Sequence, residues 1–207
     1  MFKPSQHMLL LILAILCLAP SEVAYHRVKH VYDGDTVRLE NGQRLRYLGV
    51  NTPEVRHDRR RAEYLANSAR NFNRELVTNA RISLEYDRRK KDRYGRLLAY
   101  VFMENGEMVN DLLVQKGLAH VMINGDDMLY RDLLLASQRG AINKRLGIWT
   151  KLLKTDKEQY LGNSNSLRFH RTTCRFSKKI CKTNTVKFKS RRDAYWEGYS
   201  PCKQCNP

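Results

Sequence analysis

The stretch from Thr36 to Val50, TVRLENGQRLRYLGV, constrains the fold more than any other part of this chain of 207 residues. Asn41-Gly42 separates two runs whose side chains alternate between two faces, which predicts a β-hairpin with a type I′ turn. Apolar residues of the second run point to both faces, Leu48 to one and Tyr47 to the other. Because both faces need cover, the pattern favours a small curled barrel with helices packed against it.

The rest of the first 150 residues supplies the other elements of such a barrel. Apolar residues at spacings of three and four predict a helix over about 60–78, and similar patterns predict a short helix before Gly117 and a longer one ending near Gly147. ARISLEY and LLAYVFM are predicted to be strands. The predicted fold class is therefore α+β, a five-stranded OB-type barrel with about three packed helices and a small C-terminal module.

Cysteine and histidine spacing sets the C-terminus apart. Four of the five cysteines lie in the last 34 residues, and two ligand pairs stand out, His170-x3-Cys174 and Cys202-x2-Cys205. Four such ligands in two close pairs suit tetrahedral zinc, which predicts a zinc-ribbon-like module. Two disulfides are the alternative, which export from the cell favours.

Composition predicts where the segments begin and end. Residues 1–21 carry Lys3, an apolar run of 12 residues and a small-residue cleavage site, so a signal peptide is expected. The barrel domain is predicted over 25–152. The small polar stretch GNSNS indicates a flexible linker over 153–167, followed by the module at 168–207.

The charge of the chain points to a polyanionic partner. Its formal net charge is +17, and residues 168–207 hold 11 Lys and Arg against 2 Asp and Glu. Aromatic residues are interleaved with this basic run, a combination that suits phosphate contacts and base stacking. Nucleic acid is therefore the leading candidate, ahead of acidic lipid or glycan.

Three motifs of the barrel region, DGDT, RYLGVNTPE and DRYGR, place charged residues at strand ends or loops. They offer the carboxylates of Asp35 and Glu54 and the guanidiniums of Arg46 and Arg96. Alone, Asp-Gly is more simply a turn. Together, these groups suit phosphodiester hydrolysis, because guanidiniums can fork onto phosphoryl oxygens while one carboxylate takes a proton from water.

In the same order, DGDTVRL, RYLGVNTPE, DRYGRLLAYVF, MVNDLLVQKGLA and GIW resemble the staphylococcal (micrococcal) nuclease family over about residues 27–150. The resemblance implies a calcium site formed by Asp35, Asn51 and the carbonyl of Thr52. It also implies that Arg46 and Arg96 are the catalytic arginines and that Glu54 is the general base. Cleavage leaving 3′-phosphate ends is the implied reaction.

Two departures from that family pattern affect the expected site. Asn51 stands where the best-known member has a second aspartate, so we expect weaker calcium affinity or a different preference among divalent ions. HVMINGDD lacks the tyrosines that stack on nucleotide in that relative.

In the tail, GYSPCKQC resembles the N-terminal zinc module of the Ada DNA-repair methyltransferase, with His170 in place of a cysteine.

The sequence thus predicts an exported, monomeric, calcium-dependent endonuclease that acts on DNA, with RNA left open as a second substrate, and that holds zinc in its tail. Secretion or release into a periplasm is expected without stable membrane association, and an uncleaved N-terminal anchor is the alternative. A protein of another class, a catalytically weak barrel that captures nucleic acid at the cell surface, is the competing hypothesis. Arg46, Glu54 and Arg96 together favour the enzyme, whereas Asn51 favours the binding protein.

Overall fold

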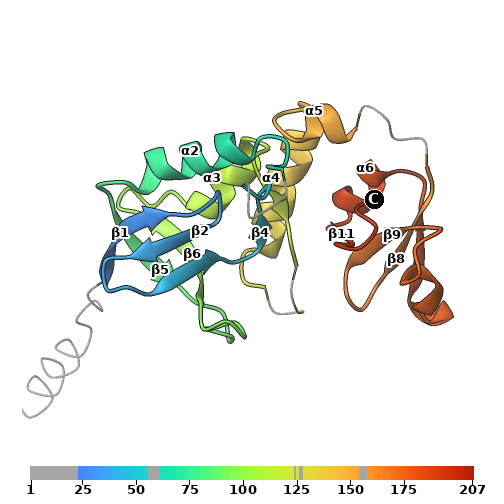
Figure 1. Cartoon of the computed structure of the whole chain (residues 1–207), viewed down its shortest axis with the longest axis horizontal. Helices are drawn as coiled ribbons and strands as arrows, with labels where there is room; N and C mark the ends of the chain where they lie inside the picture. Colours follow the sequence, from blue (N-terminus) through green and yellow to red (C-terminus); the bar gives the residue numbers. More distant parts are fainter. Residues whose placement is uncertain (1–22, 56–60, 124, 126–127, 154–157) are drawn as a thin grey trace, which may run out of the picture.

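A computed structural model describes residues 23–55, 61–123, 125, 128–153 and 158–207 (Figure 1). The predicted signal peptide at 1–21 lies outside the described residues. Within the described part of the chain, no helix combines the length and apolar character needed to cross a membrane.

Five strands close into a barrel, as the alternating patterns predicted, in the order β1-β2-β3-β6-β5. Their bounds are β1 Tyr25–Val31, β2 Thr36–Leu39, β3 Arg44–Tyr47, β5 Arg81–Glu85 and β6 Leu97–Met103. All neighbours are antiparallel except β3 and β6, which run parallel. Side chains from early and late strands fill the barrel interior. Leu45 and Tyr47 of β3, Ile82 of β5 and Tyr100 of β6 are fully buried. The predicted fold class is confirmed for this part.

The hairpin between β2 and β3 is confirmed, but its predicted turn type is wrong. Only Gly42 has a positive φ, at 83°, whereas a type I′ turn needs Asn41 in that region as well. The amide of Gly42 instead donates to the carbonyl of Leu39, and the side chain of Asn41 accepts from the amide of Gln43 at 3.0 Å. This local side-chain bond holds Asn41 in an ordinary conformation.

Helices cover the barrel and continue toward the C-terminus. Helix α2 (Ala66–Val77) packs on β1 and on α3 (Val109–Gln115), and α3 packs on β6 and on α4 (Arg131–Asn143). The predicted helix over 60–78 begins too early, because the described residues 61–65 are not helical. Leu65 has a φ of 64°, a left-handed conformation that breaks the helical path just before Ala66.

A second sheet follows the barrel, with strands in the order β10-β8-β9-β11. Figure 1 labels three of them, β8, β9 and β11. Its elements are β8 Tyr160–Asn163, β9 Arg168–Arg171, β10 Thr185–Phe188 and β11 Ser200–Pro201, with the short helices η1 Ser177–Lys179, η2 Lys182–Asn184 and α6 Arg191–Trp196. We refer to this sheet and its helices, residues 158–207, as the tail module.

The prediction of a flexible linker over 153–167 is wrong for its described C-terminal part, because β8 lies within it. Tyr160 is buried, and Gly162 faces two aromatic rings. A Cβ atom at Gly162 would lie 2.5 Å from Phe188 Cε2 and 2.7 Å from Tyr199 Cε1. The small residue that indicated a linker is thus required by close packing. Residues 154–157 lie outside the described residues.

The tail module is packed against the barrel domain rather than only joined to it. Trp149 of α5 (Trp149–Leu152) and Ala141 of α4 share one buried cluster with Phe169 and Tyr195 of the module. The side chain of Gln138 links both parts, since it accepts from the amide of Val121 and donates to the carbonyl of Tyr195, each at 2.6 Å. The predicted domain boundary therefore crosses a continuous core.

Gly162→Ala is expected to destabilise the tail module by about 1–3 kcal/mol, because the added methyl group would overlap the rings of Phe188 and Tyr199. Urea unfolding followed by tryptophan fluorescence measures this, since Trp149 and Trp196 both lie in the shared cluster. Gly140→Ala in α4 is the matched control. It faces open space and is expected to stabilise by about 0.5–1 kcal/mol. Equal effects of both substitutions would contradict the packing at Gly162.

Candidate active site

One polar pocket of about 380 Å³ collects most of the barrel residues that the sequence singled out. It lies where the beginning of β2, strand β3, strand β4 (Val50–Asn51) and the segment before β6 meet. Its lining consists of charged and polar groups with one tyrosine and one methionine: Tyr32, Asp33, Asp35, Thr36, Arg44, Arg46, Asn51, Glu54, Arg96, Met122 and Lys203. Thr52 adjoins the pocket through its bonds to Asp35.

The loop before β2 holds two carboxylates in a fixed turn. Asp33 accepts from the amide of Asp35 at 2.9 Å, a side-chain bond that closes the turn. Gly34 has no room for a side chain, since a Cβ would lie 2.6 Å from Thr52 Cγ2 and 2.8 Å from Ala69 Cβ. Burial and the neighbouring Asp35 raise the pKa of Asp33 to about 7. Burial disfavours the charged form of Asp33, and the like charge of Asp35 repels it.

The Asp35 carboxylate is the most heavily bonded group of the pocket. One oxygen accepts from the amide and the hydroxyl of Thr52, at 2.7 and 3.0 Å. The other accepts from the hydroxyl of Thr36 at 3.1 Å and forms an ion pair with Arg46. With Asp35 only 4% exposed, this carboxylate connects β2 to β3 and β4.

A buried histidine orients the amide of Asn51. His120 of β7 (His120–Val121) pairs with Asn51 across the two-stranded sheet, and its Nδ1 lies 3.0 Å from the carbonyl of Val121. Only a protonated Nδ1 can donate there, so Nε2 accepts from Asn51 Nδ2 at 3.3 Å. Asn51 Oδ1 therefore points to the guanidinium of Arg46, 3.0 Å away. Burial lowers the pKa of His120 to about 4, so the ring is neutral.

Glu54 and Arg96 are held by their surroundings in different ways. The amide of Glu54 donates to the carboxylate of Glu63 at 2.9 Å, while its own carboxylate forms no hydrogen bond or ion pair with the described residues. Arg96 is tied to Asp92, whose carboxylate accepts from Nε at 2.7 Å and from the Arg96 amide at 3.0 Å. The outer guanidinium nitrogens of Arg96 form no hydrogen bond with the described residues.

The donors of the pocket fit a hard divalent cation. Asp35 offers a carboxylate and Asn51 an amide oxygen in the pocket, and the carbonyl of Thr52, which accepts from Asn51 Nδ2 at 3.4 Å, adjoins it. These are the kinds of oxygen ligand that Ca²⁺ and Mg²⁺ prefer. The pKa of Asp33 is raised first by burial and second by the neighbouring charge of Asp35, and a bound cation would offset only the second of these causes.

The four ligands predicted in the tail lie together. One donor atom from each of His170, Cys174, Cys202 and Cys205 falls within 4.8 Å of the others. Cys174 Sγ and His170 Nδ1 are 3.7 Å apart. All four tail cysteines are free thiols, and Cys181 is exposed outside the group. Two thiols and the histidine are buried, so the group is a compact cluster with soft and borderline donors.

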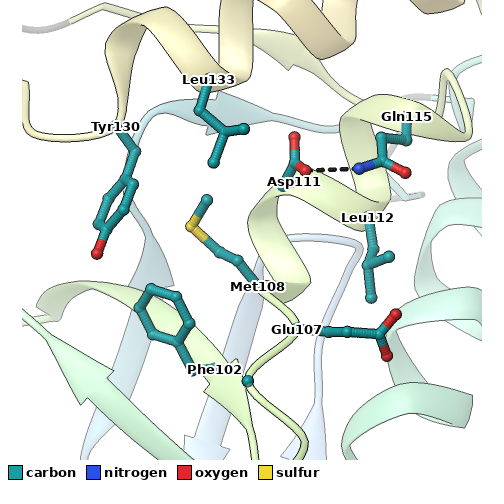
Figure 2. Close-up of a pocket in the computed structure, with 9 residues that line it drawn as sticks. Phe102, Glu107, Met108, Asp111, Leu112, Gln115, Tyr130 and Leu133 are labelled. Atoms are coloured by element: carbon teal, nitrogen blue, oxygen red, sulfur yellow. Dashed lines mark hydrogen bonds between the residues drawn. The ribbon is translucent and has the colours of Figure 1, made fainter.

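A second pocket of about 310 Å³ differs in chemistry from the first. It lies over α3 and the end of β6, lined mainly by Phe102, Met108, Leu112, Tyr130 and Leu133. Figure 2 shows that its Asp111 and Gln115 side chains are bonded to each other, at 2.6 Å. It holds no arginine or lysine, so the charged pocket is the candidate active site.

Sequence reasoning missed three residues that shape the candidate site. Asp92 stood within a quoted motif, and its spacing to Tyr94 and Arg96 is that of a local side-chain turn. His120 and Lys203 carried no such signal, because only the fold brings them to the pocket.

The chain matches the family model described as "Staphylococcal nuclease homologue" over residues 44–151. It is similar to a thermonuclease of Staphylococcus intermedius, with 41% identity over 127 residues that cover 60% of this chain and 75% of that protein. It is also similar to a thermonuclease of Staphylococcus hyicus, 34% identical with the same coverage, and to endonuclease YncB of Bacillus subtilis, 36% identical over 58% of each chain.

Asn73→Ala is expected to destabilise the chain by about 2–4 kcal/mol, because two buried groups lose their partner. Asn73 accepts from the hydroxyl of Tyr47 at 2.9 Å and donates to the carbonyl of Asp33 at 3.1 Å. Urea unfolding monitored by circular dichroism measures the loss. Asn71→Ala, an exposed position on the same helix, should change stability by less than about 0.5 kcal/mol. A similar small change for Asn73→Ala would refute this support of the Asp33 loop.

Proposed function

The chain belongs to the family of staphylococcal nuclease homologues, and from that membership we propose that it is a divalent-metal-dependent endonuclease acting on DNA, with RNA as an open second substrate. One observation carries the proposal: two arginines, the oxygen donors Asp35 and Asn51, and a glutamate whose carboxylate has no partner among the described residues line one pocket. A protein that only binds nucleic acid needs positive charge, but it does not need this combination.

The reaction we propose is attack of water on phosphorus, with breakage of the bond to the 5′ oxygen and a 3′-phosphate as product. The Glu54 carboxylate is the general base, and its lack of a partner among the described residues leaves it free to take the proton of the water. Arg46 and Arg96 donate to the phosphoryl oxygens, where negative charge grows in the transition state. Asp35 and Asp92 hold these guanidiniums before substrate arrives.

Asp35, Asn51 and the carbonyl of Thr52 are proposed to hold calcium, which would add positive charge and orient the scissile phosphate. Asn51 contributes an oxygen without a charge, and His120 holds this amide in a fixed orientation with Oδ1 toward Arg46. Because the amide of Asn51 carries no charge, we still expect weaker calcium affinity than an aspartate at this position would give. It is also the one observation that favours the second candidate function, a catalytically weak barrel that captures nucleic acid.

Zinc is proposed for the cluster of His170, Cys174, Cys202 and Cys205, in preference to two disulfides. The closeness of one histidine and three free thiols supports this, as does the position of Cys181 outside the group. Such a metal would give the small tail module stability that its few apolar residues alone supply poorly.

Export of a monomer through a signal peptide at 1–21 stays part of the proposal, with an N-terminal anchor as the alternative. The net charge of +17 supports a polyanionic substrate.

Glu54→Gln and Arg96→Ala are each expected to lower kcat by about a hundredfold or more, because each removes a group that acts in the transition state. Digestion of single- and double-stranded DNA is measured with calcium, with magnesium and with a calcium chelator. Glu75→Gln and Arg93→Ala, exposed residues outside the pocket, are the controls and should cleave like wild type. Salt-sensitive binding without cleavage under any of these conditions would refute the enzyme and support the binding protein.

Native mass spectrometry of the purified chain should show one zinc ion, and Cys174→Ser should lose it, because three remaining ligands bind zinc far more weakly. Cys181→Ser should keep the ion, since this exposed thiol lies outside the cluster. A metal-free mass reduced by two or four hydrogens would establish disulfides in place of zinc.

A further inference from the structure

Lys203 of the tail module lines the same pocket as Arg44, Arg46 and Arg96 of the barrel. The three arginines belong to β3 and the segment before β6, whereas Lys203 follows β11, more than 100 residues further along the chain. Its side chain is exposed, and among the described residues it forms no hydrogen bond or ion pair. An ammonium group without a partner among the described residues thus lines the pocket in which we place the reacting phosphate.

The backbone at Lys203 is anchored on both sides. Lys203 lies between Cys202 and Cys205 of the Cys/His cluster, and the amide of Cys202 donates to the carbonyl of Phe169 at 2.9 Å. Just before it, the hydroxyl of Ser200 donates to the carbonyl of Val121 at 3.1 Å, which connects β11 directly to the barrel strand β7. The position of Lys203 relative to the pocket is therefore set by the fold, not by a loose tether.

Further contacts fix the orientation of the whole module. The ring of Tyr195 meets that of His120 edge to face, with centroids 5.5 Å apart. The side chains of Ile123 and Leu135 pack closely against Gly198. These contacts join the tail module to the strand that carries the histidine beside Asn51. The candidate active site and the tail module consequently both pack against β7.

We propose that the nucleic-acid strand continues from the barrel pocket onto the tail module and that Lys203 binds a phosphate next to the scissile one. This inference rests on the proposed nuclease function. The forked guanidiniums of Arg46 and Arg96 suit the reacting phosphate, whereas the flexible stem and point charge of a lysine suit a neighbouring phosphate.

A contact with a flanking phosphate has a definite kinetic signature. Lys203 binds substrate and transition state equally, so its loss raises KM and leaves kcat nearly unchanged. A substrate with a single phosphodiester has no flanking phosphate and should not respond to the loss. The Cys/His cluster, which holds the backbone of Lys203, thereby acts as a positioning element for substrate as well as a structural one.

The test compares Lys203→Ala with Lys187→Ala, an exposed lysine on β10 at the opposite edge of the tail sheet. On a 20-nucleotide single-stranded DNA, we expect Lys203→Ala to raise KM by about threefold to tenfold with kcat within about twofold of wild type. On a thymidine dinucleotide with one phosphodiester, the KM and kcat of Lys203→Ala should equal those of wild type. Lys187→Ala should change neither, and Lys203→Arg should restore KM on the longer strand.

Binding of the same 20-nucleotide strand, measured in the Glu54→Gln background over a series of salt concentrations, gives a readout independent of turnover. Lys203→Ala should lower the slope of log affinity against log salt by about 0.7, the value for one phosphate contact on a single strand. Tryptophan fluorescence checks that the variants are folded.

If the nuclease is active but Lys203→Ala and Lys187→Ala have the same KM and the same salt slope, the inference about Lys203 is wrong while the proposed function stands. A wild-type chain that cleaves nothing would instead overturn the proposed function. In that case the salt slope still decides whether Lys203 contacts the strand.

Discussion

The rest of the candidate site depends on the hydrogen bonds and the ion pair of the Asp35 carboxylate. Its two oxygens connect the start of β2 to Arg46 on β3 and to Thr52 after β4, so three separate segments meet at one buried charge. Removing a partner of such a group leaves a buried charge uncompensated, which is costly. The carboxylate therefore shapes the pocket and offers a cation ligand at the same time, and Gly34 allows the approach of Thr52 that makes this possible.

A chain of contacts extends this order from Asp35 to the far end of the protein. Arg46 bonds Asn51, Asn51 bonds His120, and His120 meets Tyr195 of the tail module. Gln138 satisfies buried backbone groups on both sides of the junction. A barrel and a module joined in this way behave as one unit, because separating them exposes a shared apolar cluster and leaves buried polar groups unpaired. The tail module is thus part of the architecture of the site.

The local patterns of the chain predicted the barrel well but misread some boundaries. Alternation of apolar residues around Gly42 correctly indicated β2 and β3, since strand periodicity is a local property. Composition failed at Gly162, whose small size indicated a linker although it lies in a strand that must admit two aromatic rings. Apolar spacing likewise failed to show where α2 begins, because the left-handed backbone at Leu65 has no sequence signature.

The sequence by itself determined which barrel residues line the charged pocket and which four residues form the cluster in the tail. Asp35, Arg46, Asn51, Glu54 and Arg96 stand in ordered motifs, and paired ligand spacing marks His170 and Cys202, so short-range pattern was sufficient. Only the tertiary structure decided that His120 orients Asn51 and that Lys203 stands at the pocket. These contacts join segments about 70 and more than 100 residues apart in sequence, and such pairings arise from packing between elements, which no local periodicity records.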